Sequence, residues 1–219
     1  MSDATPLDDQ TRTAIMTAVA EGFDEQIDFT SELVKFPSVR GAEQTAQDFM
    51  AHELGDRGYG VDRWKVELDD IAHLPGFSPV HVNYDNAYNT VGSYRSDNPK
   101  GHSLILNGHI DVVPVGPADM WARPPFEPYV EGDWLYGRGS GDMKAGIAEC
   151  VYAMDALKRL GYAPAGDVYV QSVIEEECTG NGALACLQRG YKADAALIPE
   201  PLGEQLVRAQ IGVIWFQVK

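Results

Sequence analysis

The chain has 219 residues, enough for one substantial α/β domain or for one domain plus the start of another, and its 44% hydrophobic and 10% aromatic content suits a globular core. Its 17 Lys and Arg against 33 Asp and Glu give a formal net charge of −16. This negative balance argues against nucleic acid as a partner, because phosphate binding requires a basic surface.

The sequence also argues against membrane insertion and disulfide formation. It contains no run of about 18 apolar residues, and its acidic first residues lack the pattern of a signal peptide. The three cysteines, Cys150, Cys178 and Cys186, are odd in number and lack the spacing of a redox pair. We therefore expect a cytoplasmic protein with reduced thiols and no membrane partner.

The N-terminal part of the chain predicts helices followed by a strand. Residues 8–36 favour a helical region that is interrupted near Gly22, and residues 42–57 favour a second amphipathic helix. A strand is predicted near residues 61–66, and an irregular stretch rich in proline and glycine follows it.

The rest of the chain alternates strands with helices. Residues 103–106, 168–174 and 195–198 are short apolar runs that resemble buried strands. Helices are predicted over residues 143–160 and 181–189. This alternation predicts an α/β fold with a layered, mixed and partly parallel sheet and helices on both faces.

The first candidate site follows the apolar run that ends near Leu106. It presents His109 and, two residues later, Asp111. Imidazole is a good ligand for zinc-like metals, and a carboxylate on its other nitrogen would fix the tautomer. Taken alone, this pair is equally consistent with a structural histidine.

Two further sites also admit ordinary explanations when each is considered by itself. Asp142 follows a glycine-rich segment at the start of a predicted helix, where it could simply cap that helix. The segment lacks the spacing of a phosphate-binding loop. Glu175, Glu176 and Glu177 follow a buried strand, where they either form a solvated charge run or provide a metal ligand and a general base.

Glu200 closes the last apolar run and is held between two prolines. Together these sites place one imidazole and several carboxylates at one edge of a single sheet, because ligand-binding residues collect at the carboxyl ends of parallel strands. Such a set of donor atoms suits Zn²⁺, Mn²⁺ or Co²⁺. Cys178 lies nearby, and we interpret it as a small buried residue rather than a catalytic thiol.

The order of these motifs resembles one family of zinc hydrolases, which includes acetylornithine deacetylase, succinyl-diaminopimelate desuccinylase, aminoacylase, glutamate carboxypeptidase and several dipeptidases. The resemblance runs from about Leu33 to the C-terminus. It rests on the following segments: His109–Pro114, Trp121 with Pro125-Phe126, Leu135–Gly139, Asp142–Lys144, Glu175–Glu177 and Glu200-Pro201.

The resemblance implies a role for each site residue. His109, Asp142, Glu177 and Glu200 would bind two divalent metal ions, with Asp142 bridging them and a cis peptide following it. Asp111 would orient His109. Glu176 would be the general base that deprotonates a metal-bridging water, and Glu175 would occupy the position of the usual leading aspartate.

The resemblance further implies a two-metal hydrolase that cleaves an amide C–N bond in a small, carboxylate-bearing substrate, such as an N-acyl amino acid or a C-terminal peptide bond. The alternatives are a dipeptidase, a hydrolase of a carbamoyl or aryl amine bond, and a metal-binding module without catalytic activity. The Glu at position 200 favours the deacylases and carboxypeptidases over the dipeptidases of this family.

Two departures from the family pattern affect these expectations. Ala145 stands where a glycine is common, which we expect to be tolerated. The second metal requires a histidine from later in the chain, whereas all five histidines precede the glutamate triplet. We therefore expect residues 1–208 to be the N-terminal part of a catalytic domain and residues 209–219 to be the first strand of a lid and homodimerisation domain that is mostly missing.

Overall fold

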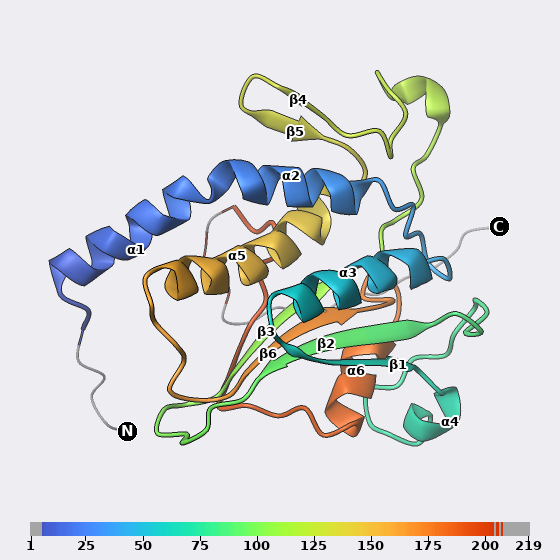
Figure 1. The fold of residues 1–219 in the computed structure, drawn as a ribbon. Coiled ribbons are helices and arrows are strands. Elements are labelled where there is room, and N and C mark those ends of the chain that lie inside the picture. The colour runs from blue at the N-terminus through green and yellow to red at the C-terminus, as the bar shows by residue number, and fades with distance from the viewer. Residues whose placement is uncertain (1–5, 204, 206, 208–219) are drawn as a thin grey trace.

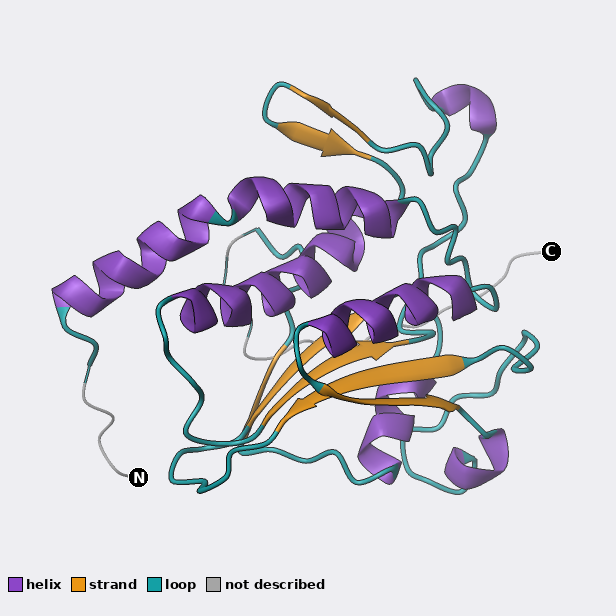
Figure 2. Ribbon diagram, in the orientation of Figure 1, coloured by secondary structure: helices purple, strands orange, loops and turns teal. Residues whose placement is uncertain are grey.

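A mixed five-stranded sheet forms the centre of the computed structural model, which describes residues 6–203, 205 and 207 (Figures 1 and 2). The strand order is β1-β2-β6-β3-β7. The pairs β1–β2 and β2–β6 are antiparallel, whereas β6–β3 and β3–β7 are parallel. The strands span Gly60–Lys65 (β1), Tyr88–Tyr94 (β2), Leu104–His109 (β3), Val168–Val173 (β6) and Ala195–Leu197 (β7).

Helices cover both faces of this sheet, as the sequence predicts. α3 and α5 lie on one face, with α1 and α2 stacked over α5, and α6 lies on the other face with the short α4 beside it (Figure 1). The helices span Asp9–Glu21 (α1), Phe23–Val34 (α2), Gln44–Asp56 (α3), Leu68–Ile71 (α4), Ala145–Arg159 (α5) and Asn181–Gln188 (α6). The helical region at the N-terminus breaks at Gly22, as predicted.

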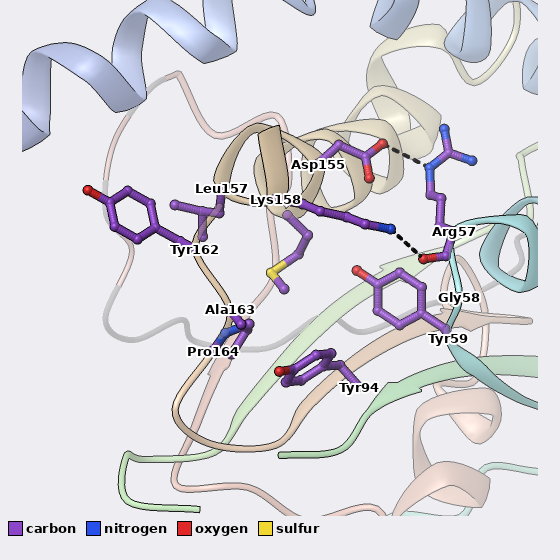
Figure 3. A pocket seen from close by; sticks show the side chains of 11 residues that line it. Arg57, Gly58, Tyr59, Tyr94, Asp155, Leu157, Lys158, Tyr162, Ala163 and Pro164 are labelled. Atoms are coloured by element: carbon purple, nitrogen blue, oxygen red, sulfur yellow. Dashed lines mark hydrogen bonds and ion pairs between the residues drawn. The ribbon is translucent and has the colours of Figure 1, made fainter. Parts of the chain in front are cut away.

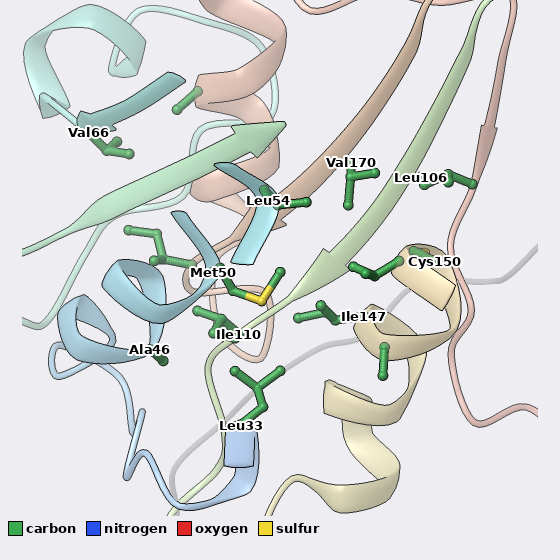
Figure 4. Packing of buried hydrophobic residues seen from close by; sticks show 14 of the residues in the cluster. Leu33, Ala46, Met50, Leu54, Val66, Leu106, Ile110, Ile147, Cys150 and Val170 are labelled. Atoms are coloured by element: carbon green, nitrogen blue, oxygen red, sulfur yellow. The ribbon is translucent and has the colours of Figure 1, made fainter. Parts of the chain in front are cut away.

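The main hydrophobic core lies between the sheet and the α2, α3 and α5 layer (Figure 4). Leu33, Met50, Leu54, Ile110 and Ile147 are almost completely buried there. Each such side chain contributes about 1.5–3 kcal/mol through its removal from water. Every residue of β6 is buried, including the polar Gln171 and Ser172, because β6 is a central strand with helices on both faces.

The structure differs from the sequence-based prediction in four strands. β2 was not predicted, because its Asn, Gly and Ser residues interrupt the apolar pattern of a strand. A small hairpin, β4 (Tyr129–Glu131) and β5 (Trp134–Tyr136), lies within a region expected to be loop. β7 exists, but the expectation that it is buried is wrong, since all three of its residues are exposed and it pairs only with β3.

Shorter elements connect these layers. A 3₁₀ helix spans Ala118–Met120, and a π-type turn spans Ser140–Lys144 directly before α5. Within the described residues, none of the helices has both the length and the apolar character needed to cross a bilayer. The predicted strand over residues 209–219 lies outside the described residues.

Candidate metal centre

Six polar residues from four separate segments meet at one edge of the sheet. β3 ends at His109 and is followed by Asp111, and the turn before α5 carries Asp142. Glu176 and Glu177 follow β6, and Glu200 follows β7. Because β6, β3 and β7 run parallel, their carboxyl ends lie at the same edge, and this brings the segments together.

His109 is the centre of this cluster. Its Nε2 atom lies 3.0 Å from Asp142 Oδ1, 3.7 Å from Glu176 Oε2 and 3.8 Å from Glu200 Oε1. The His109 side chain is only 1% exposed, whereas the side chains of Asp142 and Glu176 are 55% and 50% exposed. The imidazole is therefore fixed within the protein, whereas the carboxylates of Asp142 and Glu176 are exposed to solvent.

Asp111 organises both the histidine and the glutamate segment. The main-chain carbonyl of Asp111 lies 2.9 Å from His109 Nδ1, closer than its carboxylate oxygen at 3.4 Å. A bond from Nδ1 to this carbonyl leaves Nε2 free to bind a metal ion. The Asp111 carboxylate instead accepts hydrogen bonds from the backbone N–H groups of Glu176 (3.1 Å) and Glu177 (3.2 Å).

Asp142 does not cap the following helix. It has φ −117° and ψ 104°, which lie outside the helical region, and the N-terminal cap of α5 is Lys144. The peptide bond from Asp142 to Met143 is cis, as the family resemblance implied. Met143 is completely buried, so the carboxylate of Asp142 projects from an anchored turn.

The three consecutive glutamates have different environments. Glu175 is 1% exposed and has a φ of 58°. Its carboxylate accepts hydrogen bonds from Tyr84 Oη (2.5 Å) and Thr179 Oγ1 (2.8 Å) and therefore faces the protein interior. Glu176 and Glu177 are the members of the triplet that lie within reach of His109.

The cluster has too little positive charge for its carboxylates. Burial first, and then the neighbouring carboxylates, raise the pKa of Glu200 to about 7, and burial also raises the pKa values of Glu176 and Glu177. Burial opposes the charged form of His109, but the surrounding carboxylates outweigh it and raise the His109 pKa to about 10. Within residues 6–203, no lysine or arginine forms an ion pair with Asp142, Glu176, Glu177 or Glu200.

These donor atoms fit divalent cations. They form two groups, His109–Glu176–Glu200 and His109–Asp142–Glu177, and the donor atoms within each group lie within 4.8 Å of one another. One imidazole with several carboxylates is a donor set that zinc, manganese and cobalt accept. A bound cation would also supply the positive charge that the cluster lacks.

Several supporting residues could not be identified from the sequence. Tyr84 contacts Glu175 across 91 positions of chain, and Arg40 lies 3.6 Å from the Glu175 carboxylate. Asn89 of β2 donates to the carbonyl of Gly182 (2.7 Å) and accepts from the N–H of Ile174 (3.1 Å). These contacts fix the segment that carries Glu176 and Glu177, but no local pattern marks the residues that make them.

One cavity lies away from the ligand groups, and another adjoins them. One, of about 310 Å³, lies near the amino-terminal ends of β3 and β6, where Tyr59, Tyr94 and Tyr162 border it (Figure 3). It is therefore at the other end of the sheet from His109. The second, of about 420 Å³, includes Glu177 and Cys178 in its lining. Cys178 is exposed, so the expectation that it is a buried residue is wrong; all three cysteines are free thiols.

Comparison with known sequences identifies relatives of this chain. A family model described as Peptidase family M20/M25/M40 matches residues 105–214, about half of the chain. The N-formyl-4-amino-5-aminomethyl-2-methylpyrimidine deformylase of Bacillus subtilis (strain 168) is 31% identical over 218 residues, which are 96% of this chain and 47% of the relative. The succinyl-diaminopimelate desuccinylase of Rhodopseudomonas palustris (strain BisB5) is 34% identical over 184 residues, 81% of this chain and 43% of the relative. The chain thus spans about half the length of the curated relatives it matches.

Solved structures share this fold. An M20 family metallo-carboxypeptidase from Sulfolobus solfataricus, Sso-CP2, superimposes with a TM-score of 0.59 at 20% sequence identity, over 80% of this chain and 37% of that one. Human carnosine dipeptidase 1 gives a TM-score of 0.59 at 19% identity, over 81% of this chain and 37% of that one. These similarities confirm the predicted class of fold, a partly parallel α/β sheet.

Proposed function

Because this chain belongs to peptidase family M20/M25/M40, we propose that it forms the metal-binding part of a hydrolase that cleaves an amide C–N bond in a small substrate. The observation that carries this proposal is the meeting of one buried imidazole with four carboxylates at the carboxyl edge of the parallel strands. Such a cluster is costly without a cation and is well suited to bind one.

His109, Asp142, Glu177 and Glu200 are the proposed metal ligands, for two divalent ions that are zinc or, alternatively, manganese or cobalt. Bound there, such ions would polarise the substrate carbonyl and lower the pKa of a water molecule. We propose that the histidine that completes the second ion's ligands is supplied by a part of the protein outside this sequence, because His109 is the only one of the five histidines present that belongs to either ligand group.

Glu176 is the proposed general base. Its carboxylate lies beside His109, is half exposed, and has a pKa that burial raises, so it can both accept and release a proton. Glu176 would take a proton from the attacking water and donate it to the nitrogen of the departing amine. Asp111 would hold Glu176 and Glu177 in place through their backbone N–H groups.

The relatives favour deacylation over the alternatives. One is named for removing an N-formyl group and the other for removing a succinyl group. A dipeptidase, as in the carnosine dipeptidase structure, is the second candidate. The remaining candidates are a hydrolase of a carbamoyl or aryl amine bond and a metal-binding module without catalytic activity.

Other features of the whole protein belong to the same proposal. The predicted substrate carboxylate has no evident partner among the described residues at the site, where Arg40 already faces Glu175. We propose that its binding residues, and the contacts of a homodimer, lie in a lid domain that begins near residue 209. A cytoplasmic location fits the three free thiols.

Amine release by the full-length protein tests this function. The protein would be reconstituted with zinc, manganese or cobalt and assayed with N-acyl amino acids, dipeptides and aryl amides. Glu176→Gln should lower kcat by about 10³-fold or more while metal content is retained, because it removes the proton acceptor alone. Glu177→Gln should lose metal. Loss of metal in Glu176→Gln, with Glu177→Gln still active, would reverse the two assignments.

A further inference from the structure

An apolar pocket adjoins the candidate metal centre. It has a volume of about 420 Å³ and shares Glu177 with the proposed ligand set. Its walls include Val39, Val82, Val113 and Phe126, which come from separate segments of the chain. An apolar cavity of about 150 Å³ is enough to hold a benzene ring, so this pocket has room for a ring with substituents.

The pocket is held in a fixed position relative to His109. Val39 forms a parallel bridge with Val112, and Ser38 Oγ donates a hydrogen bond to the carbonyl of Ile110 (2.6 Å). The backbone N–H of Val112 donates to the carbonyl of Ser38 (3.0 Å). One wall is therefore attached to the segment that immediately follows His109, and Glu177 also lines the pocket.

The charges at this pocket do not favour an anionic group. Among the described residues that line it, Arg40 and Glu177 are the only ones with charged side chains. Arg40 lies 3.6 Å from the buried carboxylate of Glu175, which already balances its charge. A substrate carboxylate here would meet apolar walls and the negative Glu177, and burying an unpaired charge is costly.

We propose that this pocket binds an uncharged aromatic or branched apolar group attached to the scissile amide. It selects such substrates over those that carry a second carboxylate at the same position. This specificity rests on the proposed hydrolase function, and it places any carboxylate-binding residues elsewhere in the protein.

Matched substrates and one pair of valine variants test this inference in the metal-loaded, full-length protein. N-acylated benzylamine would be compared with N-acylated β-alanine, and phenylacetylglycine with succinylglycine, so that both sides of the amide are covered. In at least one pair the ring-bearing member should have a kcat/KM about tenfold or more higher. Val82→Asp should lower kcat/KM for the ring-bearing substrate by about 100-fold, because it places a charge in the apolar pocket. Val130→Asp is the control, because Val130 is 57% exposed on β4 and does not line the pocket.

Binding of 4-fluorobenzylamine, measured by ¹⁹F NMR, distinguishes a failure of the pocket inference from a failure of the proposed function. Cleavage of the carboxylate-bearing members at equal or higher rates, with Val82→Asp harmless, overturns the pocket inference and leaves the hydrolase in place. If neither these substrates nor the N-acyl amino acids, dipeptides and aryl amides named above are hydrolysed, the function is overturned; binding that Val82→Asp abolishes and Val130→Asp preserves would still support the pocket. Absence of both hydrolysis and binding overturns both.

Discussion

Asp111 shows how a single buried residue sets the geometry of this site. It is completely buried, and its two carboxylate oxygens accept from two consecutive N–H groups while its carbonyl lies beside His109 Nδ1. Asp111→Asn would turn an N–H group towards one of those N–H donors and remove one hydrogen bond. We expect metal affinity and kcat/KM each to fall about 10–100-fold, as measured by metal titration and steady-state kinetics.

The exposed Asp119, in the 3₁₀ helix, provides the matched control for this change. Asp119→Asn should leave both quantities unchanged. If Asp111→Asn keeps wild-type metal affinity and turnover, the two backbone contacts do not position the glutamates, and Asp111 has only a packing role.

Glu43 gives a residue-level prediction about stability. Burial, followed by the charges of Asp111 and Glu175, raises its pKa from 4.5 to about 8. The folded protein therefore keeps this proton at pH values where the unfolded chain has released it. Between about pH 4.5 and 8 the folded state binds more protons, so stability falls as pH rises, by on the order of 4–5 kcal/mol across that range.

Glu43→Gln should remove this dependence, because the amide stays neutral at every pH. Urea unfolding at several pH values between 5 and 8 measures it, and the variant should gain most over the wild type at the alkaline end. Glu21→Gln, on the exposed end of α1, should keep the wild-type slope. Equal slopes in all three proteins would show that Glu43 ionises freely in the folded state.

At the level of elements, close packing between α5 and the segment after β7 positions Glu200. Gly146 lies in the first turn of α5, and a Cβ atom there would overlap the carbonyl oxygen of Pro199. Gly146→Ala should therefore displace the neighbouring Glu200 and weaken metal binding about tenfold or more. Isothermal titration with zinc measures the loss.

Gly55 provides the control for that substitution. It lies in α3, where a new Cβ would make only an ordinary contact with Val61. Gly55→Ala should leave metal binding unchanged and raise stability by about 0.5–1 kcal/mol, because alanine restricts the unfolded chain. If Gly146→Ala keeps the zinc affinity of the wild type, the segment after β7 can move without displacing Glu200.

β2 illustrates an element that local pattern cannot reveal. Asn89 and Thr90 are completely buried within it, and Asn89 is satisfied by hydrogen bonds to the carbonyl of Gly182 and the N–H of Ile174. A buried asparagine in a strand is stable only with such partners. Those partners lie 85 and 93 positions away, so the sequence of this strand alone resembles a loop.

For the whole molecule, metal removal should expose the cost of concentrating negative charge. The chain carries a net charge of −16, and four carboxylates meet around His109. Treatment with a chelator should lower Tm, because ions that bind only the folded state stabilise it by about 4 kcal/mol at a thousandfold excess over Kd. Calorimetry in about 20 mM and about 500 mM NaCl should show a smaller loss in the higher salt, which screens the repulsion. An unchanged Tm at both salt concentrations would show that the cluster binds no ion in solution.

The sequence by itself determined the fold class, the alternation of strands and helices, and the four segments that gather at the site, while the choice of Glu176 and Glu177 within the triplet came from the family resemblance. It could do so because these properties are local: an apolar run forms a strand, and a polar residue that follows it lies at the sheet edge. Tertiary structure alone decided that Glu175 turns inward to Tyr84, that β2 lies between β1 and β6, that β7 is exposed, and that a valine-lined pocket adjoins Glu177. Each of these depends on contacts between residues far apart in the chain, whose pairing is set by packing of the whole molecule and leaves no pattern in neighbouring residues.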